Sequence, residues 1–220
     1  MIRVLLVDDQ SLLRMGFAMV LGAQPDIRVA AEAGDGMEAL EVLDRTEVDV
    51  VLMDVRMPRM DGVEATRHIS ARPGGPKVLI LTTFDLDEYA FAAVRAGASG
   101  FLLKDVPPDE LVAAIRTVHA GDAVVAPTTL GRMLGQFASA LPDATPREVE
   151  ELTAREHEVL LQVARGLSNQ EIARGLTVAE ATVKTHLGRI LNKLGLRDRA
   201  QVVVYAYENG LITPRHRPNG

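Results

Sequence analysis

Short apolar runs and helix-length amphipathic segments alternate along the first 120 residues. The runs are rich in Val, Ile and Leu, and we expect strands at Ile2–Val7, Val29–Ala33, Val50–Met53, Val78–Leu81 and Phe101–Leu103. The intervening patterns predict helices near Ser11–Leu21, Met37–Leu43, Val63–Ile69, Glu88–Ala96 and Asp109–His119. Strands without polar alternation, each followed by a helix, indicate a parallel α/β sheet that is covered on both faces.

Polar residues of the types that bind metals or phosphoryl groups follow four of these runs. They are Asp8 and Asp9, Asp54, Thr82 and Thr83, and Lys104. In a parallel sheet, the carboxyl ends of the strands share one edge, and ligands bind there. Carboxylates gathered at that edge repel one another unless a cation joins them, and oxygen ligands of this kind select Mg²⁺ or Mn²⁺. With a cation and a lysine to neutralise charge, one aspartate can accept a phosphoryl group.

Each of these residues also has an ordinary structural interpretation. Asp9 fits a helix cap, and Asp54 fits a turn. Lys104 fits a solvated loop, and Thr82 and Thr83 fit the end of a strand. Their shared position at one edge of one sheet is what favours the phosphorylation site.

The pattern changes after Leu152, where four short helical segments replace the alternation of strand and helix. Thr153 with Glu156, and Ser168 with Glu171, have the spacing of capping boxes and predict two helix starts. We therefore expect a second domain that is small and all-α.

A helix-turn-helix pair is expected within this domain, at Ser168–Gly175 and Glu180–Leu194. Gly195 stands where the second helix needs a left-handed residue to end it. Apolar residues of the second helix recur at three- and four-residue steps, which commits one face to a core. The other face carries Lys184, His186, Arg189 and Lys193, and is available to DNA phosphates and base edges. An amphipathic surface helix with merely solvated charges is the alternative.

Charge is distributed unevenly between the two halves. Residues 1–146 hold 13 Lys and Arg against 21 Asp and Glu, whereas residues 147–220 hold 11 against 9. Within 182–199 there are five basic residues and one acid. A locally basic patch in an acidic chain is compatible with DNA binding by the second half.

Composition limits the other classes of function. The chain has no cysteine, which removes disulfides, thiolate metal sites and cysteine nucleophiles and fits a reducing compartment. No segment approaches the run of about 18 uncharged apolar residues that a membrane span needs. We expect a cytoplasmic protein that makes no contact with a membrane.

Domain boundaries follow from these changes in pattern. We place the first domain at 1–120 and a linker at 121–146. Within the linker we expect a helix at Thr129–Ala140 and an extended tether at Leu141–Pro146. The second domain then occupies 147–214, and 215–220 form a tail.

Residues 1–120 resemble the receiver domain of bacterial two-component response regulators. The resemblance rests on Asp8-Asp9, on Val-Leu-Met-Asp54-Val-Arg-Met57-Pro58 with Asp61-Gly62, and on Lys104. It implies a doubly wound, five-stranded parallel sheet of order 2-1-3-4-5, like that of flavodoxin. The residue after the lysine is Asp105 rather than the proline of many receivers, so the geometry of that loop stays open.

The same resemblance assigns expected roles to individual residues. Asp54 would be the phosphoacceptor, and Asp8, Asp9, Asp54 and the backbone carbonyl of Arg56 would hold the metal. Thr82 would be the switch hydroxyl, Phe101 the switch aromatic and Lys104 the invariant lysine. Arg56 and Thr83 would tune the lifetime of the phosphoryl group.

The second half is similar to the LuxR-type DNA-binding domain. The matching segments are Leu152–Glu156, Gly166–Ala173, Thr182–Leu187 and Lys193–Leu196, and a receiver followed by this domain is the layout of the NarL/FixJ class. The match implies that Lys184 and Thr185 face base edges and that Thr182, His186 and Lys193 lie near the DNA backbone. Gly188 departs from the pattern, because the family often has a polar contact residue there.

The match also makes the last helix, near Arg199–Tyr207, a dimer surface. Val202, Val203 and Tyr205 are the candidate contacts, and ordinary core positions are the alternative for all three.

The resemblance implies a non-enzymatic transcription regulator. A sensor histidine kinase would phosphorylate Asp54, and the phosphorylated homodimer would bind promoter DNA. Two alternatives stay open from the residues alone. A hydrolase that forms an aspartyl-phosphate usually has a second Asp two residues after the nucleophile, where this chain has Arg56. A DNA-binding protein without phosphate control would not need the complete acidic site.

Overall fold

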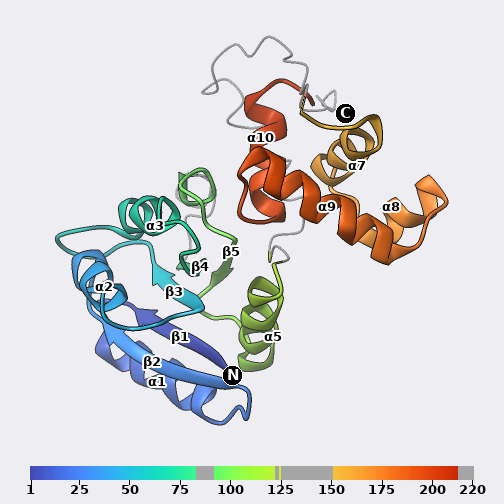
Figure 1. Cartoon of the computed structure of the whole chain (residues 1–220). Helices are drawn as coiled ribbons and strands as arrows, with labels where there is room; N and C mark the ends of the chain where they lie inside the picture. Colours follow the sequence, from blue (N-terminus) through green and yellow to red (C-terminus); the bar gives the residue numbers. More distant parts are fainter. Residues whose placement is uncertain (83–91, 122–123, 125–150, 213–220) are drawn as a thin grey trace, which may run out of the picture. The chain divides into compact units, whose positions relative to one another are not determined.

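The computed structural model describes residues 1–82, 92–121, 124 and 151–212 (Figure 1). The chain divides into two compact units, Met1–Val124 and Val125–Gly220, and each is described by itself. Several expectations lie outside the described residues. They are Thr83, the first part of the helix expected at 88–96, the linker helix at 129–140, the tether at 141–146 and the tail at 215–220.

A five-stranded parallel sheet forms the centre of the first unit. Its order is β2-β1-β3-β4-β5, which confirms the fold that the sequence predicts. The strands are β1 (Ile2–Val7), β2 (Ile27–Ala33), β3 (Val50–Asp54), β4 (Lys77–Thr82) and β5 (Gly100–Leu103). Asp54 pairs with Leu81, and Thr82 pairs with Leu103, so the carboxyl ends of three neighbouring strands meet at one edge.

Helices cover both faces of this sheet (Figure 1). They are α1 (Ser11–Gly22), α2 (Gly36–Leu43), α3 (Gly62–Ser70) and α5 (Pro108–His119), and residues 92–95 are also helical. Leu5 and Val7 of β1 pack in the core beneath α2 and α3, whereas Val4 and Leu6 pack in the core beneath α1 and α5. Alternate side chains of one strand thus enter two cores, which is why its sequence is apolar throughout.

Side-chain caps set several helix starts in this unit. Asp35 accepts a hydrogen bond from the amide of Glu38 at the start of α2, and Asp61 does the same for Glu64 at the start of α3. The capping interpretation of Asp9 is wrong, because Gln10 is the N-cap of α1 and no side chain caps that helix. Asp9 therefore remains available for another role.

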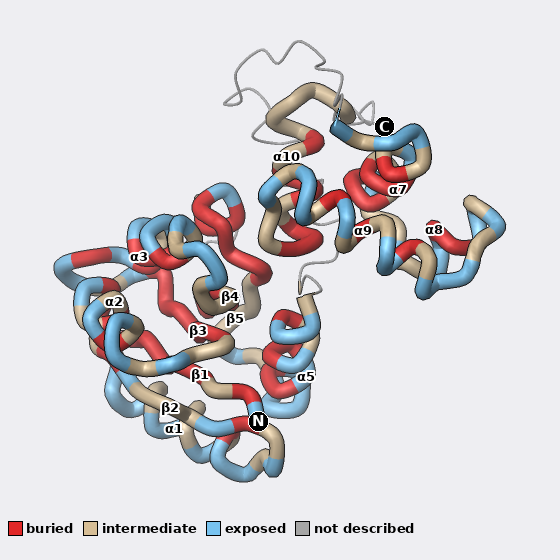
Figure 2. Tube along the Cα trace, viewed as in Figure 1, coloured by how far each residue is buried: buried red, intermediate tan, exposed pale blue. Residues whose placement is uncertain are grey.

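The second unit contains four helices within its described residues. They are α7 (Ala154–Ala164), α8 (Asn169–Leu176), α9 (Glu180–Leu194) and α10 (Arg199–Glu208). Both predicted capping boxes are present, at the starts of α7 and α8. Gly195 ends α9 with φ of 64°, in the left-handed conformation expected for it. Figure 2 shows where buried residues lie along each of these helices.

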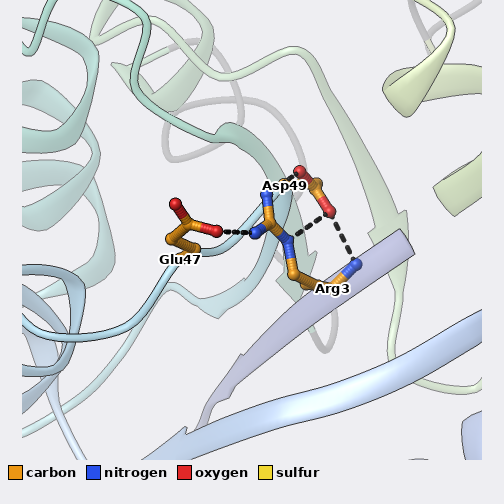
Figure 3. A network of polar contacts seen from close by, with 3 residues as sticks. All are labelled: Arg3, Glu47 and Asp49. Atoms are coloured by element: carbon orange, nitrogen blue, oxygen red, sulfur yellow. Dashed lines mark hydrogen bonds and ion pairs between the residues drawn. The ribbon is translucent and has the colours of Figure 1, made fainter. Parts of the chain in front are cut away.

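Arg3 joins the amino ends of β1 and β3, at the edge of the sheet opposite Asp54 (Figure 3). Its Nε donates to Asp49 Oδ2 at 3.0 Å, its Nη2 donates to Asp49 Oδ1 at 2.8 Å, and its backbone amide donates to Asp49 Oδ2 at 2.8 Å. Glu47 contacts the remaining guanidinium nitrogen. The hydrogen bonds from Arg3 lower the pKa of Asp49 to about 2.

This depressed pKa predicts a pH-dependent contribution to stability. The Asp49 carboxylate stabilises the fold above its ordinary pKa of 3.8, and the contribution is lost as pH falls towards 2. Allowing for solvent screening, we expect Asp49→Asn to lower the free energy of unfolding by about 1 kcal/mol at neutral pH. The variant should also lose less stability than the unaltered protein as pH falls from about 4 to about 2. Urea denaturation across this range measures both effects.

Glu47→Gln is the matched control for this experiment. The Glu47 side chain is 87% exposed, so its ion pair with Arg3 should contribute little to the free energy of unfolding. Equal pH profiles for Asp49→Asn and the unaltered protein would contradict the assignment.

Candidate functional site

Asp54 lies at the carboxyl end of β3, in a cluster of buried polar side chains. Lys104 Nζ lies 2.9 Å from Asp54 Oδ2 and 2.6 Å from Asp8 Oδ2. All three side chains are less than a tenth exposed. The amide of Val55 donates to Asp54 Oδ1 at 2.7 Å, and the amide of Gln10 donates to Asp8 Oδ1 at 2.9 Å. Residues from three different strand ends therefore meet around one ammonium group, as the sequence predicts.

Three carboxylates of this cluster form a suitable set of metal ligands. Asp8, Asp9 and Asp54 each offer an oxygen, and the three oxygens lie within 4.8 Å of one another. Asp8 and Asp54 are buried, whereas Asp9 is exposed. An all-oxygen set of negative charge fits a hard divalent cation.

The pKa values of Asp54 and Lys104 reflect burial and pairing. Burial raises the pKa of Asp54, and the opposing hydrogen bond from Lys104 only partly offsets it. Burial alone would lower the pKa of Lys104, but the hydrogen bonds to Asp8 and Asp54 outweigh it and raise the pKa. The lysine thus stays charged, and a second positive charge would favour the ionised form of Asp54.

The expected switch residues lie at the ends of the next two strands. Thr82 is buried at the end of β4, and its carbonyl accepts a hydrogen bond from the amide of Lys104 at 2.8 Å. Phe101 on β5 is partly buried against the core beneath α2 and α3. No cis peptide bond occurs among the described residues, so the Lys104–Asp105 bond, which the sequence left open, is trans. The side chain of Arg56, two residues after Asp54, is exposed.

Gly62 brings the start of α3 against the backbone of the phosphoacceptor strand. A Cβ at this position would lie 1.9 Å from the carbonyl oxygen of Asp54. The amide of Gly62 donates to the carbonyl of Val55 at 2.9 Å, which closes the loop between β3 and α3. The Asp61-Gly62 dipeptide thus combines a helix cap with a close backbone approach, and the sequence alone does not reveal the second role.

The candidate DNA-reading helix is α9. Val183, Leu187 and Ile190 are buried in the second unit, as predicted. On the remaining surface, Lys184, Thr185 and Arg189 are exposed, and Thr182 and His186 are partly buried. The Lys184 ammonium lies 3.6 Å from Glu180 one turn earlier, and both side chains are largely exposed. An exposed pair of this kind contributes little and can open to a phosphate.

Lys193 has a partner within its own unit, which sequence reasoning missed. Its Nζ lies 2.7 Å from Glu156 Oε2, and that oxygen also accepts from the amide of Thr153 at 2.9 Å. The hydrogen bond from Lys193, followed by that from Thr153, lowers the pKa of Glu156 to about 2. The capping-box spacing marks Glu156, but nothing in the sequence pairs it with a residue 37 positions later.

Two of the expected dimer contacts are not on the surface. Val202 and Val203 are 0% and 1% exposed and pack in the core of the second unit. The core interpretation, which the sequence left as an alternative, therefore holds for both, because successive positions on α10 face neighbouring helices of the same unit. Tyr205 is partly exposed.

Comparisons with known proteins assign both units. The model of the response regulator receiver domain matches residues 4–116, and that of bacterial regulatory proteins of the luxR family matches residues 150–206. The chain is a two-component response regulator. A receiver implies a histidine-kinase partner, and a luxR-type domain implies DNA binding. Members of this family are DNA-binding regulators rather than enzymes, so the hydrolase alternative is set aside.

Relatives cover nearly the whole regulator. The uncharacterized transcriptional regulatory protein YxjL of Bacillus subtilis (strain 168) is 47% identical over 212 residues, which are 96% of this chain and 97% of YxjL. The transcriptional regulatory protein LiaR of the same strain is 42% identical over 96% of this chain and all of LiaR. The crystal structure of the response regulator ChrA, from a heme-sensing two-component system, matches with 42% identity and a TM-score of 0.51 over 96% of this chain and 98% of ChrA.

Among the described residues, no helix has the length and apolar character that crossing a membrane requires.

The close approach at Gly62 gives a test of how the regulator builds its site. We expect Gly62→Ala to destabilise the receiver by about 3 kcal/mol, because the added methyl group would overlap the Asp54 carbonyl. Gly16→Ala is the matched control, since a Cβ there has no neighbour within 4 Å on the exposed side of α1. That change should stabilise the helix by about 0.5–1 kcal/mol. Urea denaturation followed by circular dichroism measures both, and equal effects would refute the steric argument.

Proposed function

We propose that a sensor histidine kinase transfers a phosphoryl group to Asp54 and that this modification controls promoter binding by α9. The observation that carries the proposal is the buried meeting of Asp8, Asp54 and Lys104, with Lys104 2.9 Å from the acceptor carboxylate. A carboxylate attacking a phosphoryl group must overcome repulsion between negative charges, and a fixed ammonium reduces it.

The divalent cation of this reaction would be Mg²⁺ or Mn²⁺, held by Asp8, Asp9, Asp54 and the backbone carbonyl of Arg56. When bound, it supplies positive charge to the phosphoryl oxygens. Support comes from the three carboxylate oxygens within 4.8 Å of one another and from the exposure of Asp9, which leaves the ligand set open to solvent.

Thr82 and Lys104 would then contact the phosphoryl group. The amide of Lys104 already donates to the carbonyl of Thr82, so a movement of either residue toward Asp54 would displace the other. Phe101 on β5 precedes Lys104 by three residues and would change its packing against the core beneath α2 and α3. Thr83 and the side chain of Arg56 would tune the lifetime of the phosphoryl group. Such a local change of charge can bias a two-state surface.

For DNA, we propose that Lys184 and Thr185 read base edges and that Thr182, His186, Arg189 and Lys193 lie near phosphates. Exposure of Lys184, Thr185 and Arg189 on one side of a helix whose other side is buried supports this division. Lys193 is the weakest of these contacts, because Glu156 neutralises part of its charge. The phosphorylated regulator would bind as a homodimer, with Tyr205 as the remaining candidate contact on α10.

Loss of the acceptor tests the phosphorylation. We expect Asp54→Asn to abolish labelling by a histidine kinase and by acetyl phosphate, because an amide cannot attack phosphorus in place of the carboxylate. Asp61→Asn is the matched control: it alters a nearby carboxylate, keeps the cap of α3, and should label as the unaltered regulator does. Undiminished labelling of Asp54→Asn would refute the proposal.

The salt dependence of binding tests the DNA contacts. With a promoter fragment, Lys184→Ala should weaken binding and reduce the slope of log affinity against log salt by about 1, if its ammonium displaces one counterion. Lys193→Ala should reduce the slope less, because its charge is shared with Glu156. Fluorescence anisotropy at several salt concentrations provides the slopes. An unchanged slope for Lys184→Ala would contradict its contact with DNA.

A further inference from the structure

A strained turn lies in the loop between β3 and α3. Arg59 has φ of 62°, in the left-handed region, and the amide of Met60 donates to the carbonyl of Pro58 at 2.7 Å. A hydrogen bond that spans a single residue of positive φ is the pattern of the rarer, strained form of γ-turn. A residue with a Cβ is disfavoured at such a position, so the surrounding structure must hold Arg59 there.

Two contacts fasten this turn to the start of α2. Arg59 Nε donates to Asp35 Oδ2 at 2.5 Å, and Nη2 of the same guanidinium pairs with the same oxygen. The amide of Gly36 donates to the carbonyl of Met60 at 3.2 Å. The two partners differ in burial, since 4% of the Asp35 side chain is exposed against 64% of the Arg59 side chain. The ion pair therefore extends from a buried anchor to the surface of the loop.

Asp35 divides its two oxygens between two elements. Oδ1 accepts from the amide of Glu38 at 3.0 Å and caps α2, while Oδ2 receives Arg59. Burial alone would raise the pKa of Asp35, but the hydrogen bonds from Glu38 and Arg59 hold it below its usual value. A buried carboxylate is tolerated when it is fully hydrogen-bonded, so each partner helps to keep the other contact in place.

The fastened turn belongs to the same short loop as the expected carbonyl ligand. The loop leaves β3 after Asp54, closes where the amide of Gly62 donates to Val55, and carries Arg56 three residues before Arg59. A loop that is held at both ends and at its tip has little freedom for the residues between. Its conformation at Arg56 must therefore depend on the turn at Arg59.

We infer that Asp35 is a positioning residue for the phosphorylation site: its ion pair with Arg59 holds the strained turn and, through it, keeps the Arg56 backbone in the conformation that binds a divalent cation beside Asp54. The inference rests on the proposed metal site and adds to it a residue that touches neither the metal nor the phosphoryl group.

Binding of Mn²⁺ to the full-length regulator, followed by electron paramagnetic resonance of the free ion, tests the inference without requiring phosphorylation. Asp35→Asn removes the ion pair but keeps a good cap, because Asn caps helices about as well as Asp. We expect Mn²⁺ affinity to fall about tenfold, the lower end of the effect of residues that support metal ligands. Arg59→Gln should produce a similar loss, since it removes the charge and keeps the Cβ.

Rescue separates a role in the turn from a general loss of structure. Glycine adopts positive φ without steric cost, so Asp35→Asn combined with Arg59→Gly should restore Mn²⁺ affinity to within about threefold of the unaltered regulator. Asp44→Asn is the matched control. It breaks the 2.9 Å pair with Arg72, which joins the far ends of α2 and α3, and should leave Mn²⁺ affinity unchanged.

The outcomes distinguish this inference from the proposed function. If the unaltered regulator binds Mn²⁺ and Asp35→Asn binds it equally well, the positioning role is refuted while the metal site stands. If Arg59→Gly fails to restore Mn²⁺ affinity to Asp35→Asn, the inference is also overturned, because the loss of affinity would then have a cause other than the turn. If the unaltered regulator binds no Mn²⁺, the metal site is wrong and the inference fails with it, whereas labelling of Asp54 tests the acceptor separately.

Discussion

The buried ammonium of Lys104 is the interaction on which the phosphorylation site depends. It joins Asp8 after β1 with Asp54 at the end of β3, and it is supplied by the loop after β5, so one charge links three strand ends. Buried charges are tolerated only when they are paired, and here two carboxylates share one cation. The site thus keeps an excess of negative charge among buried side chains, which favours a divalent cation. Any group that binds Asp54 must change the partners of Lys104.

Close backbone contact is the second requirement of this sheet edge. Gly62 lies against the carbonyl of Asp54, and a Cβ at Gly36 would lie 2.9 Å from the carbonyl of Met60. Both glycines bring a helix start against the loop that follows the acceptor, and each helix is capped by the aspartate before it. Departures from regular geometry are expected where a structure supports chemistry, since such positions are held by their neighbours rather than by local preference.

The sequence predicted those features that depend on local pattern. The parallel sheet, both capping boxes and Gly195 followed from periodicity and spacing, and the meeting of Asp54 with Lys104 followed from the shared edge of such a sheet. The order of the strands followed only from the resemblance to receiver domains. Features that depend on side-chain direction were missed or wrong. The pairing of Lys193 with Glu156 requires the packing of α9 on α7, and burial of Val202 requires knowledge of which side of α10 meets its neighbours. Spacing along the chain specifies neither.

The use of arginine rather than glycine at position 59 has a mechanical consequence. Glycine would adopt the positive φ of this turn by itself, and only the hydrogen bond from Gly36 to Met60 would then fasten the loop to α2. With Arg59, the conformation of the loop is stable only while Asp35 holds the guanidinium, and Asp35 in turn caps α2. Loop and helix are therefore coupled through this carboxylate as well as through the hydrogen bond from Gly36 to Met60. A change at the phosphorylation site that shifts this loop is therefore expected to reach the start of α2, because Asp35 and Gly36 both contact the loop.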